Sequence, residues 1–326
     1  MHTVTLARHA MATRFELVLH GEDATALRAA GEEALDEIDR LENQLSLYRP
    51  GSEIAQLNAR AAREPVRVTP PVFALLQQAK NISEETGGAF DITIAPLVRC
   101  WGFMGGNGRM PMPDEVATAR AKTGMQQVLL DSQNCTVQFA REGVMLDLGA
   151  IGKGYAVGQA AEILRETGIT SALIHGGTST VYAIGHPPDG ESWNVAIETP
   201  PGMTVAPDTW PGAIPLRDEA MSVSAVWGRF FEKDGRMVGH VIDPRSGQPV
   251  NRALLTMVVL GSATETDAFS TALMVLGPDG HAAISKLRPG AKTLLVSDAD
   301  GVFRTEIRDL PGGGAGRSDN LVEKRR

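Results

Sequence analysis

The spacing of apolar residues changes along this chain, and the order of those changes constrains the fold more than any other feature of the sequence. Residues 14–19 alternate apolar and polar side chains, as a half-buried strand does. Strand patterns also dominate 171–261, and a helical pattern follows at about 265–276. An amphipathic helix is predicted by apolar positions three and four residues apart, at Leu27, Ala30, Ala34, Ile38, Leu41 and Leu45. Because strands and helices do not alternate strictly, this order favours an α+β fold over a doubly wound α/β fold.

Turn-forming residues bound the other predicted elements. The Asp-Gly pair in Lys233-Asp234-Gly235 is typical of a β-hairpin turn. The proline-rich loop 186–217 is expected to be an excursion from the core, and the glycine-rich tail 311–326 is expected to be disordered. The remaining predictions are a helix from about Pro70 to Gly87, a helix at about 153–167, and strands at 127–131, 135–139, 144–148 and 292–297.

The overall charge excludes one large class of partner. The formal net charge is -8, whereas a nucleic-acid-binding protein needs a basic face to displace counterions. A nucleotide ligand is still compatible with this charge, because a metal ion can supply positive charge locally. The two cysteines, Cys100 and Cys135, have no CxxC spacing, which argues against a zinc cluster or a thiol redox motif.

The sequence also gives an expectation for localisation. The first 30 residues contain no apolar segment of signal-peptide type and no cysteine that could carry a lipid anchor. No stretch approaches the ~20 apolar residues of a transmembrane helix. The chain as written is therefore expected to have no transmembrane segment and to be cytoplasmic.

The stretch from Asp147 to Tyr155 is rich in glycine and suggests an anion site. It is not a Walker A loop, because Gly149 is too close to the Gly-Lys pair and Gly154 stands where Ser or Thr belongs. It is not a Rossmann fingerprint either, because Val157 occupies the third glycine position. A glycine-rich turn that opens a helix can still present backbone N–H groups to an anion. The alternative is a tight strand-to-helix turn with no ligand.

A second segment, 264–273, places two oxygen donors on one face of a predicted helix. Asp267 and Thr271 are four residues apart, and a carboxylate and a hydroxyl so placed suit Mg²⁺. The alternative is a helix cap, because Thr264 and Asp267 match the [ST]-x-x-[DE] capping pattern.

The third segment, 239–247, contains a histidine before an Asp-Pro turn. His240 could act as a general base, since the ordinary pKa of histidine lies near neutrality. The alternative is a surface histidine beside a turn.

These three segments, in this order, resemble the ApbE family of FAD:protein FMN transferases. The resemblance covers about residues 11–300. Four stretches strengthen it: Met11-Ala12-Thr13-Arg14-Phe15, where the family has Met-Gly-Thr; Ser46 to Glu53, with Leu57-Asn58 following; Thr86 through Leu97 with Trp101-Gly102-Phe103; and Asp147 to Tyr155, which matches Asp-Leu-Gly-x-Ile-x-Lys-Gly-Tyr. The resemblance implies a single ApbE-like (T-fold-like) domain over 1–310, with mixed or antiparallel sheets packed against helices. It also implies that relatives are often exported, which leaves localisation open.

The resemblance assigns roles to individual residues. Mg²⁺ would be held by the Ala150 backbone carbonyl, the Asp267 carboxylate and the Thr271 hydroxyl, with phosphate oxygens of FAD completing its shell. His240 is the implied base. FAD would be contacted at Met11, Tyr48, Ala89, Phe90, Asp91, Asp147, Lys153 and Ile242.

The implied reaction transfers the FMN half of FAD to a threonine of an acceptor protein and releases AMP. If water attacks in place of threonine, the same site is an FAD pyrophosphatase; a protein that binds FAD without catalysis is a further alternative. Two stretches depart from the family pattern, namely His175 to Ser179 and Val223 to Trp227.

Overall fold

The chain folds into two compact units, each assembled from segments that are distant in sequence. The computed structural model describes residues 1–203, 210–233, 236–299, 302–310 and 320–323. Unit 1 comprises Met1–Glu42, Ile151–Ser224 and Arg252–Arg326, and unit 2 comprises Asn43–Ala150 and Ala225–Asn251. Within the described part of the chain, no helix has the length and apolar character needed to cross a membrane.

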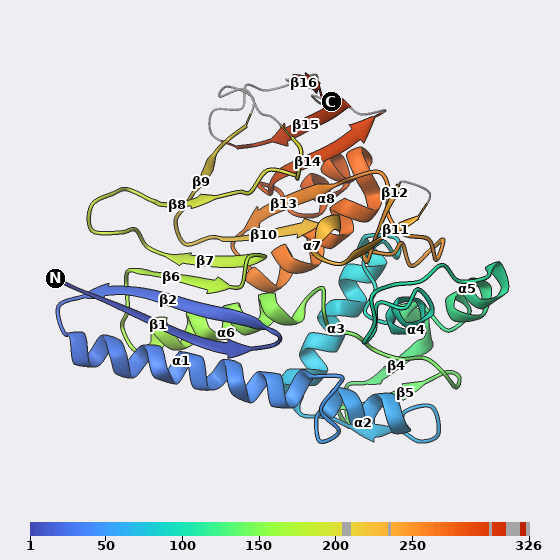
Figure 1. Cartoon of the computed structure of the whole chain (residues 1–326). Coiled ribbons are helices and arrows are strands. Elements are labelled where there is room, and N and C mark those ends of the chain that lie inside the picture. The colour runs from blue at the N-terminus through green and yellow to red at the C-terminus, as the bar shows by residue number, and fades with distance from the viewer. Residues whose placement is uncertain (204–209, 234–235, 300–301, 311–319, 324–326) are drawn as a thin grey trace. The chain divides into compact units, whose positions relative to one another are not determined.

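Unit 1 is built on a nine-stranded sheet, coloured from blue to red in Figure 1, with the order β1-β2-β6-β7-β10-β13-β14-β15-β16. Neighbours from β1 to β10 and from β13 to β16 pair antiparallel. The strands are β1 (His2–Ala10), β2 (Thr13–Gly21), β6 (Ala172–Gly176), β7 (Thr180–Ile184), β10 (Ala220–Ala225), β13 (Leu255–Leu260), β14 (Lys292–Ala299), β15 (Val302–Arg308) and β16 (Asn320–Glu323). A separate hairpin pairs β8 (Trp193–Ala196) with β9 (Ala213–Leu216).

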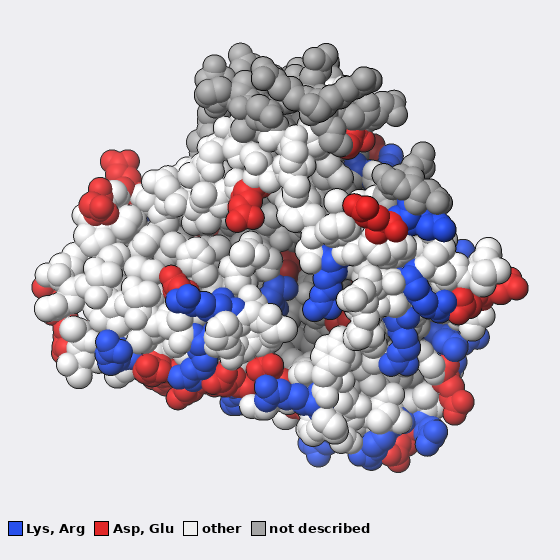
Figure 2. Space-filling model, viewed as in Figure 1, with Lys and Arg blue, Asp and Glu red and all other residues white. Residues whose placement is uncertain are grey.

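Helices α1 (Ala24–Leu45), α6 (Gly152–Glu166), α7 (Ala263–Leu276) and α8 (Gly280–Leu287) belong to this unit, α1 running three residues past its boundary. α6 packs on β6 and β7, and α7 packs on β7, β13 and α6. The predicted apolar stripe of α1 is buried, and its outer face carries ion pairs from Arg8 to Glu32 (2.8 Å) and to Asp39 (3.0 Å). Figure 2 shows basic and acidic side chains intermixed over this helix.

Unit 2 carries short helices and two small sheets. Its core includes Leu97, Trp101, Phe103 and Val116, and the Trp101 indole donates to the backbone oxygen of Gly247 at 2.9 Å. The sheets are ordered β3-β5-β4 and β11-β12. The elements are α2 (Glu53–Arg60), β3 (Val66–Arg67), α3 (Pro70–Glu85), α4 (Ala95–Cys100), α5 (Pro113–Arg120), β4 (Val128–Asp131), β5 (Thr136–Phe139), β11 (Phe230–Lys233) and β12 (Arg236–Gly239), with 3₁₀ turns at Met125–Gln127 and Val226–Gly228.

The predicted α+β class, with antiparallel sheets and helices, is confirmed. One predicted strand, at 144–148, is wrong. The backbone N–H of Leu146 donates to Oδ1 of Asn58 (2.7 Å), and the Leu146 carbonyl accepts from Nδ2 of Asn58 (3.0 Å). An amide side chain thus takes the place of a neighbouring strand. Strand β1 was not predicted, although it pairs with β2 along its whole length.

Three of the predicted loops fall partly or wholly outside the described residues, and in the loop 186–217 the part outside is 204–209. The hairpin turn at Asp234-Gly235 does so, while the strands that it joins, β11 and β12, do pair antiparallel. The tail expected to be disordered lies mostly outside as well, but Asn320–Glu323 differs from that expectation because it pairs with β15 as strand β16. The antiparallel pairing of β15 and β16 is made by backbone groups, which every residue has, so amino-acid composition does not predict it.

Candidate functional site

The residues predicted for the flavin and metal site divide between the two units. Unit 1 contains Met11, Lys153, Asp267 and Thr271. Unit 2 contains Tyr48, Ala89, Phe90, Asp91, Asp147, Ala150, His240 and Ile242.

In unit 1, Met11 lies in the two-residue turn that joins β1 to β2. Both turn residues have positive φ, 50° at Met11 and 58° at Ala12, as a type I′ hairpin turn requires. Ala12 adopts this conformation although its Cβ makes it less favourable. Behind the turn, a Cβ at Gly177 would lie 2.2 Å from the Thr13 hydroxyl oxygen. The tip of the hairpin is therefore packed against the departing stretch that follows β6.

The two segments that suggested an anion site and a metal site meet at the contact between α6 and α7. The backbone N–H of Gly154, in the first turn of α6, donates to Oδ2 of Asp267 at 2.9 Å. A Cβ at position 154 would lie 2.2 Å from the backbone oxygen of Ala263, so only glycine allows this approach. The anion that this turn binds within the protein is the Asp267 carboxylate, which is 4% exposed. The positive end of the α6 dipole favours its charge.

The capping alternative for Asp267 is wrong. α7 begins at Ala263, and its N-cap is Ser262, whose hydroxyl accepts from the Glu265 backbone N–H at 3.3 Å. Asp267 therefore lies inside the helix, one turn away from Thr271. This position supports the interpretation of the pair as oxygen donors on one helix face.

Around Thr271 the structure shows a hydroxyl cluster that the sequence did not reveal. Ser224, at the end of β10, lies 3.3 Å from the Thr271 hydroxyl and 2.8 Å from the Ser270 hydroxyl. The Thr271 hydroxyl also donates weakly to the Asp267 backbone oxygen, at 3.4 Å. Ser224 belongs to one of the two departing stretches, and no motif or spacing pointed to it. Only the pairing of β10 in the sheet brings it to α7.

These groups fit a hard divalent cation. Oδ2 of Asp267 is used by Gly154, while the described residues offer no hydrogen bond to Oδ1. Among those residues no three His, Cys, Asp or Glu side chains gather closely enough to hold a metal. A cation bound by Asp267 would thus depend on hydroxyl, backbone and ligand oxygens for the rest of its shell, and such oxygens are what Mg²⁺ prefers.

In unit 2, the charged side chains of Asp147 and Arg229 form a polar group with Tyr48, which is 65% exposed. Partial burial and the negative charge of Asp147 raise the pKa of Tyr48, and the positive charge of Arg229 opposes this rise. Asp147 itself forms an Asx turn, in which Oδ1 accepts from the Gly149 N–H at 2.8 Å. His240 joins the group through Arg229, because its Nδ1 lies 3.1 Å from the Arg229 backbone oxygen. Sequence reasoning missed Arg229.

The contact of His240 fixes the proton on its ring. A carbonyl oxygen only accepts, so Nδ1 must carry the hydrogen that is shared with Arg229. In the neutral ring Nε2 is then the proton acceptor, as a general base requires. The ring also packs against Phe103 in a T-shaped arrangement, with ring centroids 6.4 Å apart. These contacts hold the imidazole in one orientation.

The segment Ala89–Asp91 is buried, and the carboxylate of Asp91 is used by the fold. Oδ1 accepts from the backbone N–H (2.7 Å) and the hydroxyl (2.6 Å) of Thr93, and Oδ2 accepts from the Met125 N–H (3.0 Å). Burial raises the pKa of Asp91, and these hydrogen bonds oppose the rise. Ile242 is likewise a core residue, 4% exposed, with its backbone bridged to Pro249. Flavin contact at these positions stays a prediction.

Comparison with known proteins identifies the family of this chain. The ApbE family model matches residues 11–295, and the chain belongs to the ApbE family. A FAD:protein FMN transferase of Klebsiella pneumoniae (strain 342) is 32% identical over 287 residues, which is 86% of this chain and 80% of the relative. One of Treponema pallidum (strain Nichols) is 31% identical, covering 84% of this chain and 78% of the relative.

Solved structures show the same fold. The apo form of the flavinyl transferase ApbE of Pseudomonas stutzeri matches with a TM-score of 0.83 and 30% identity, covering 96% of this chain and 98% of the other. The ApbE protein of Thermotoga maritima matches with a TM-score of 0.81 and 29% identity, covering 90% and 94%.

Proposed function

We propose that this protein transfers the FMN half of FAD to a threonine of an acceptor protein, with Mg²⁺ and with release of AMP. The observation that carries the proposal is the hydrogen bond from Gly154 to Asp267, which joins the predicted phosphate turn and the predicted metal residues. The names of the relatives, FAD:protein FMN transferase, support the reaction class.

The proposed metal ligands are Asp267, Thr271 and the backbone oxygen of Ala150. When bound, Mg²⁺ supplies positive charge that stabilises the pyrophosphate and the leaving AMP. Lys153, which is half-buried in the first turn of α6, is proposed to add positive charge to the same phosphates. The remaining predicted contacts, including Tyr48 and Asp147, are proposed to bind the rest of FAD.

In the proposed chemical step, the threonine hydroxyl oxygen attacks the phosphorus on the FMN side of FAD. A new P–O bond to threonine forms, the P–O bond to AMP breaks, and the hydroxyl proton passes to Nε2 of His240. A base in this role typically contributes ~10²–10⁴-fold in rate. The hydrogen bond from Nδ1 to Arg229 supports this role, because it leaves Nε2 as the acceptor.

The proposal is tested by incubating the protein with FAD, Mg²⁺ and an acceptor protein that one of the named transferases modifies. We expect a fluorescent flavin band at the acceptor after denaturing electrophoresis, and AMP in equal amount. Free FMN without a labelled band would indicate an FAD pyrophosphatase instead. FAD binding without AMP release at any Mg²⁺ concentration would indicate a non-catalytic flavin-binding protein.

His240→Asn tests the base. We expect transfer to slow by about 10²–10⁴-fold while FAD affinity is kept. The matched control is His2→Asn, because His2 is an exposed histidine of β1. Equal rates in the two variants would remove His240 from the mechanism.

A further inference from the structure

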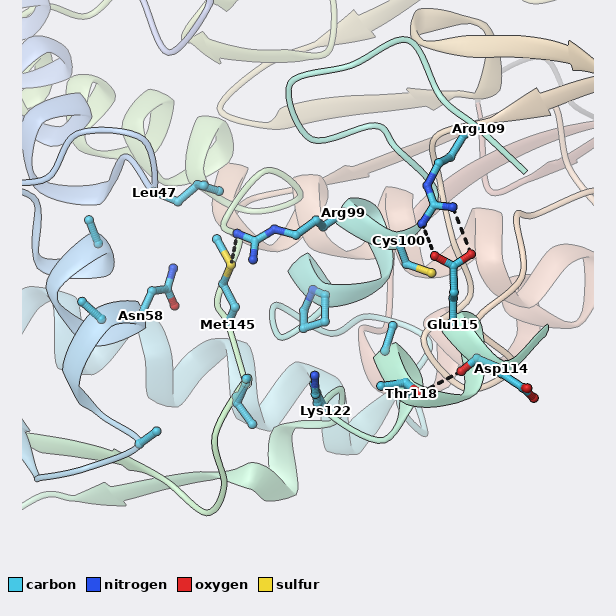
Figure 3. A pocket seen from close by; sticks show the side chains of 17 residues that line it. Leu47, Asn58, Arg99, Cys100, Arg109, Asp114, Glu115, Thr118, Lys122 and Met145 are labelled. Carbon is cyan, nitrogen blue, oxygen red and sulfur yellow. Dashed lines mark hydrogen bonds and ion pairs between the residues drawn. The ribbon is translucent and has the colours of Figure 1, made fainter. Parts of the chain in front are cut away.

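A cavity of about 830 Å³ lies wholly within unit 2. None of the residues predicted to bind FAD is among the residues that line it. Helices α2, α4 and α5 and the segment 143–145 surround it (Figure 3). Its apolar lining includes Leu47, Ala55, Ala59, Pro96 and Val144. A space of this size suits a ligand much larger than a single phosphate ion.

Three basic side chains line the cavity, and one of them is neutralised within the protein. Arg109 donates two hydrogen bonds to Glu115, at 3.0 and 2.6 Å. This pairing lowers the pKa of Glu115 to about 2, so its carboxylate is ionised and engaged. Figure 3 shows the pair at one side of the cavity, and Asp114 pointing away from it.

The other two basic side chains, Arg99 and Lys122, have no carboxylate partner among the described residues. Within the described ranges, the hydrogen-bond acceptors of the Arg99 guanidinium are the sulfur atoms of Met145 (3.1 Å) and Met104 (3.8 Å). A thioether is a weak acceptor, so the guanidinium keeps most of its capacity to donate. Figure 3 shows Arg99 stretched toward Met145 and the amino group of Lys122 directed into the same space. In a chain of net charge -8 this cavity thus offers positive charge beside apolar walls.

The position of the cavity connects it to the proposed reaction. Leu47 in its lining precedes Tyr48, and Met145 stands two residues before Asp147. The acceptor protein must approach these residues to bring its threonine to the flavin phosphate. We propose that the cavity binds an acidic side chain of the acceptor protein near its target threonine, with Arg99 and Lys122 as the recognising groups. This inference rests on the proposed function.

Charge and shape together support an acidic protein segment as the occupant. A guanidinium presents a planar fork of donors that matches a carboxylate, and the ammonium of Lys122 adds a second charge. The alanine, proline and leucine side chains of the walls suit the carbon atoms of a peptide, whereas a free phosphate would leave them uncovered.

The test uses two fluorescein-labelled nonapeptides of glycine and alanine with a central threonine. One carries two glutamates beside the threonine and the other carries two glutamines. Fluorescence anisotropy measures binding to the unmodified chain, to Arg99→Gln, to Lys122→Gln and to the double variant. The control is Arg67→Gln, which removes an exposed arginine of β3 that does not line the cavity.

We expect the acidic peptide to bind the unmodified protein more tightly than the amide peptide. Each single variant should weaken acidic-peptide binding about fivefold, the magnitude of a solvent-accessible ion pair. The double variant should bind both peptides equally, and Arg67→Gln should bind as the unmodified protein does. Unchanged thermal unfolding shows that each variant is folded.

Absence of binding, equal affinity for the two peptides, or discrimination that survives in the double variant would each overturn the inference. Inorganic phosphate or free glutamate is then added at the peptide concentration. Displacement by either would assign the cavity to a small anion and would overturn the acceptor role. Failure of AMP release from FAD would instead overturn the proposed function, because the peptide measurement needs no FAD.

Discussion

Two buried aspartates, one in each unit, show how the same side chain can serve the fold or remain available to a ligand. Asp91 is 7% exposed and accepts three hydrogen bonds from Thr93 and Met125. Asp267 is 4% exposed and accepts one, from Gly154. Burial is thus nearly equal, and the difference lies in how many acceptor positions the protein itself occupies.

Because the two carboxylates differ in the number of hydrogen bonds that they accept, replacement by asparagine should have different consequences at the two positions. An ionised carboxylate only accepts hydrogen bonds, and asparagine replaces one of its oxygens with a donor. At Asp91 both oxygens accept from N–H or O–H groups. In the asparagine variant the new NH₂ group therefore faces another hydrogen-bond donor. At Asp267 the remaining amide oxygen can still accept from Gly154, so the fold loses little while any bound cation loses its charged ligand.

The largest loss of stability is expected from a substitution at Gly154, where α6 packs closely against α7 beside Asp267. Gly154→Ala places a Cβ 2.2 Å from the Ala263 backbone oxygen and 2.6 Å from the Asp267 Cβ. We expect the free energy of unfolding to fall by about 3 kcal/mol or more, because overpacking against backbone forces α6 and α7 apart. Urea unfolding measures this loss.

Gly158→Ala is the matched control on the same helix. Its Cβ would meet nothing closer than the Thr264 hydroxyl at 3.8 Å, and alanine is favoured over glycine inside a helix. We expect unchanged or slightly higher stability. Equal destabilisation at 154 and 158 would contradict the contact as described.

The aspartates themselves give the next effect. Asp91→Asn should lower the free energy of unfolding by about 2 kcal/mol, the cost of a mismatched buried polar group. Asp267→Asn should change stability by less than about 1 kcal/mol, yet reduce Mg²⁺-dependent transfer by about 100-fold or more. Urea titrations and transfer rates test both, and the reverse pattern would exchange the two roles.

A pH dependence extends the comparison to a buried base in unit 1. His281 is buried, and its burial, together with the charge of Arg308, lowers its pKa from 6.5 to about 4. The unfolded chain therefore binds the proton first, so this group removes stability as pH falls from about 6.5 toward 4. The loss between pH 7 and pH 5 should be about 2 kcal/mol. Asp91, whose raised pKa favours protonation of the folded state, acts with the opposite sign.

His281→Gln isolates this contribution. Glutamine can still contact the Thr293 hydroxyl, which lies 2.7 Å from Nδ1 of the histidine, but it does not titrate. Urea unfolding at pH 7 and pH 5 should show a smaller loss in the variant than in the unmodified protein. The same loss in both proteins would show that other groups cause the acid sensitivity.

The smallest effect concerns Ser224, the neighbour of Thr271. Ser224→Ala should weaken binding of Mn²⁺, used as a spectroscopic probe for Mg²⁺, by about fivefold, because a hydrogen bond worth about 1 kcal/mol no longer orients the Thr271 hydroxyl. Ser222→Ala is the control, because Ser222 bonds the buried hydroxyls of Thr180 and Thr266 instead. It should lower stability and leave Mn²⁺ affinity unchanged, and equal Mn²⁺ affinity in all three proteins would separate Ser224 from the cation.

The sequence by itself determined the features that depend on neighbouring residues. Apolar periodicity gave α1 and α7, and Pro70 marked the first residue of α3. Local spacing also gave the Asp267–Thr271 pair and the glycine-rich turn, because helix geometry relates residues four apart whatever lies around them.

Tertiary structure decided which groups meet across long distances in the chain. Leu146 is not in a strand because Asn58, 88 residues away, takes both of its backbone groups. Asp267 contacts Gly154 across 113 residues, and Ser224 reaches Thr271 only through the sheet. Backbone and side-chain groups form hydrogen bonds and packing contacts with the groups that the fold brings near them. Those groups can be distant in sequence, so the spacing of neighbouring residues does not identify them.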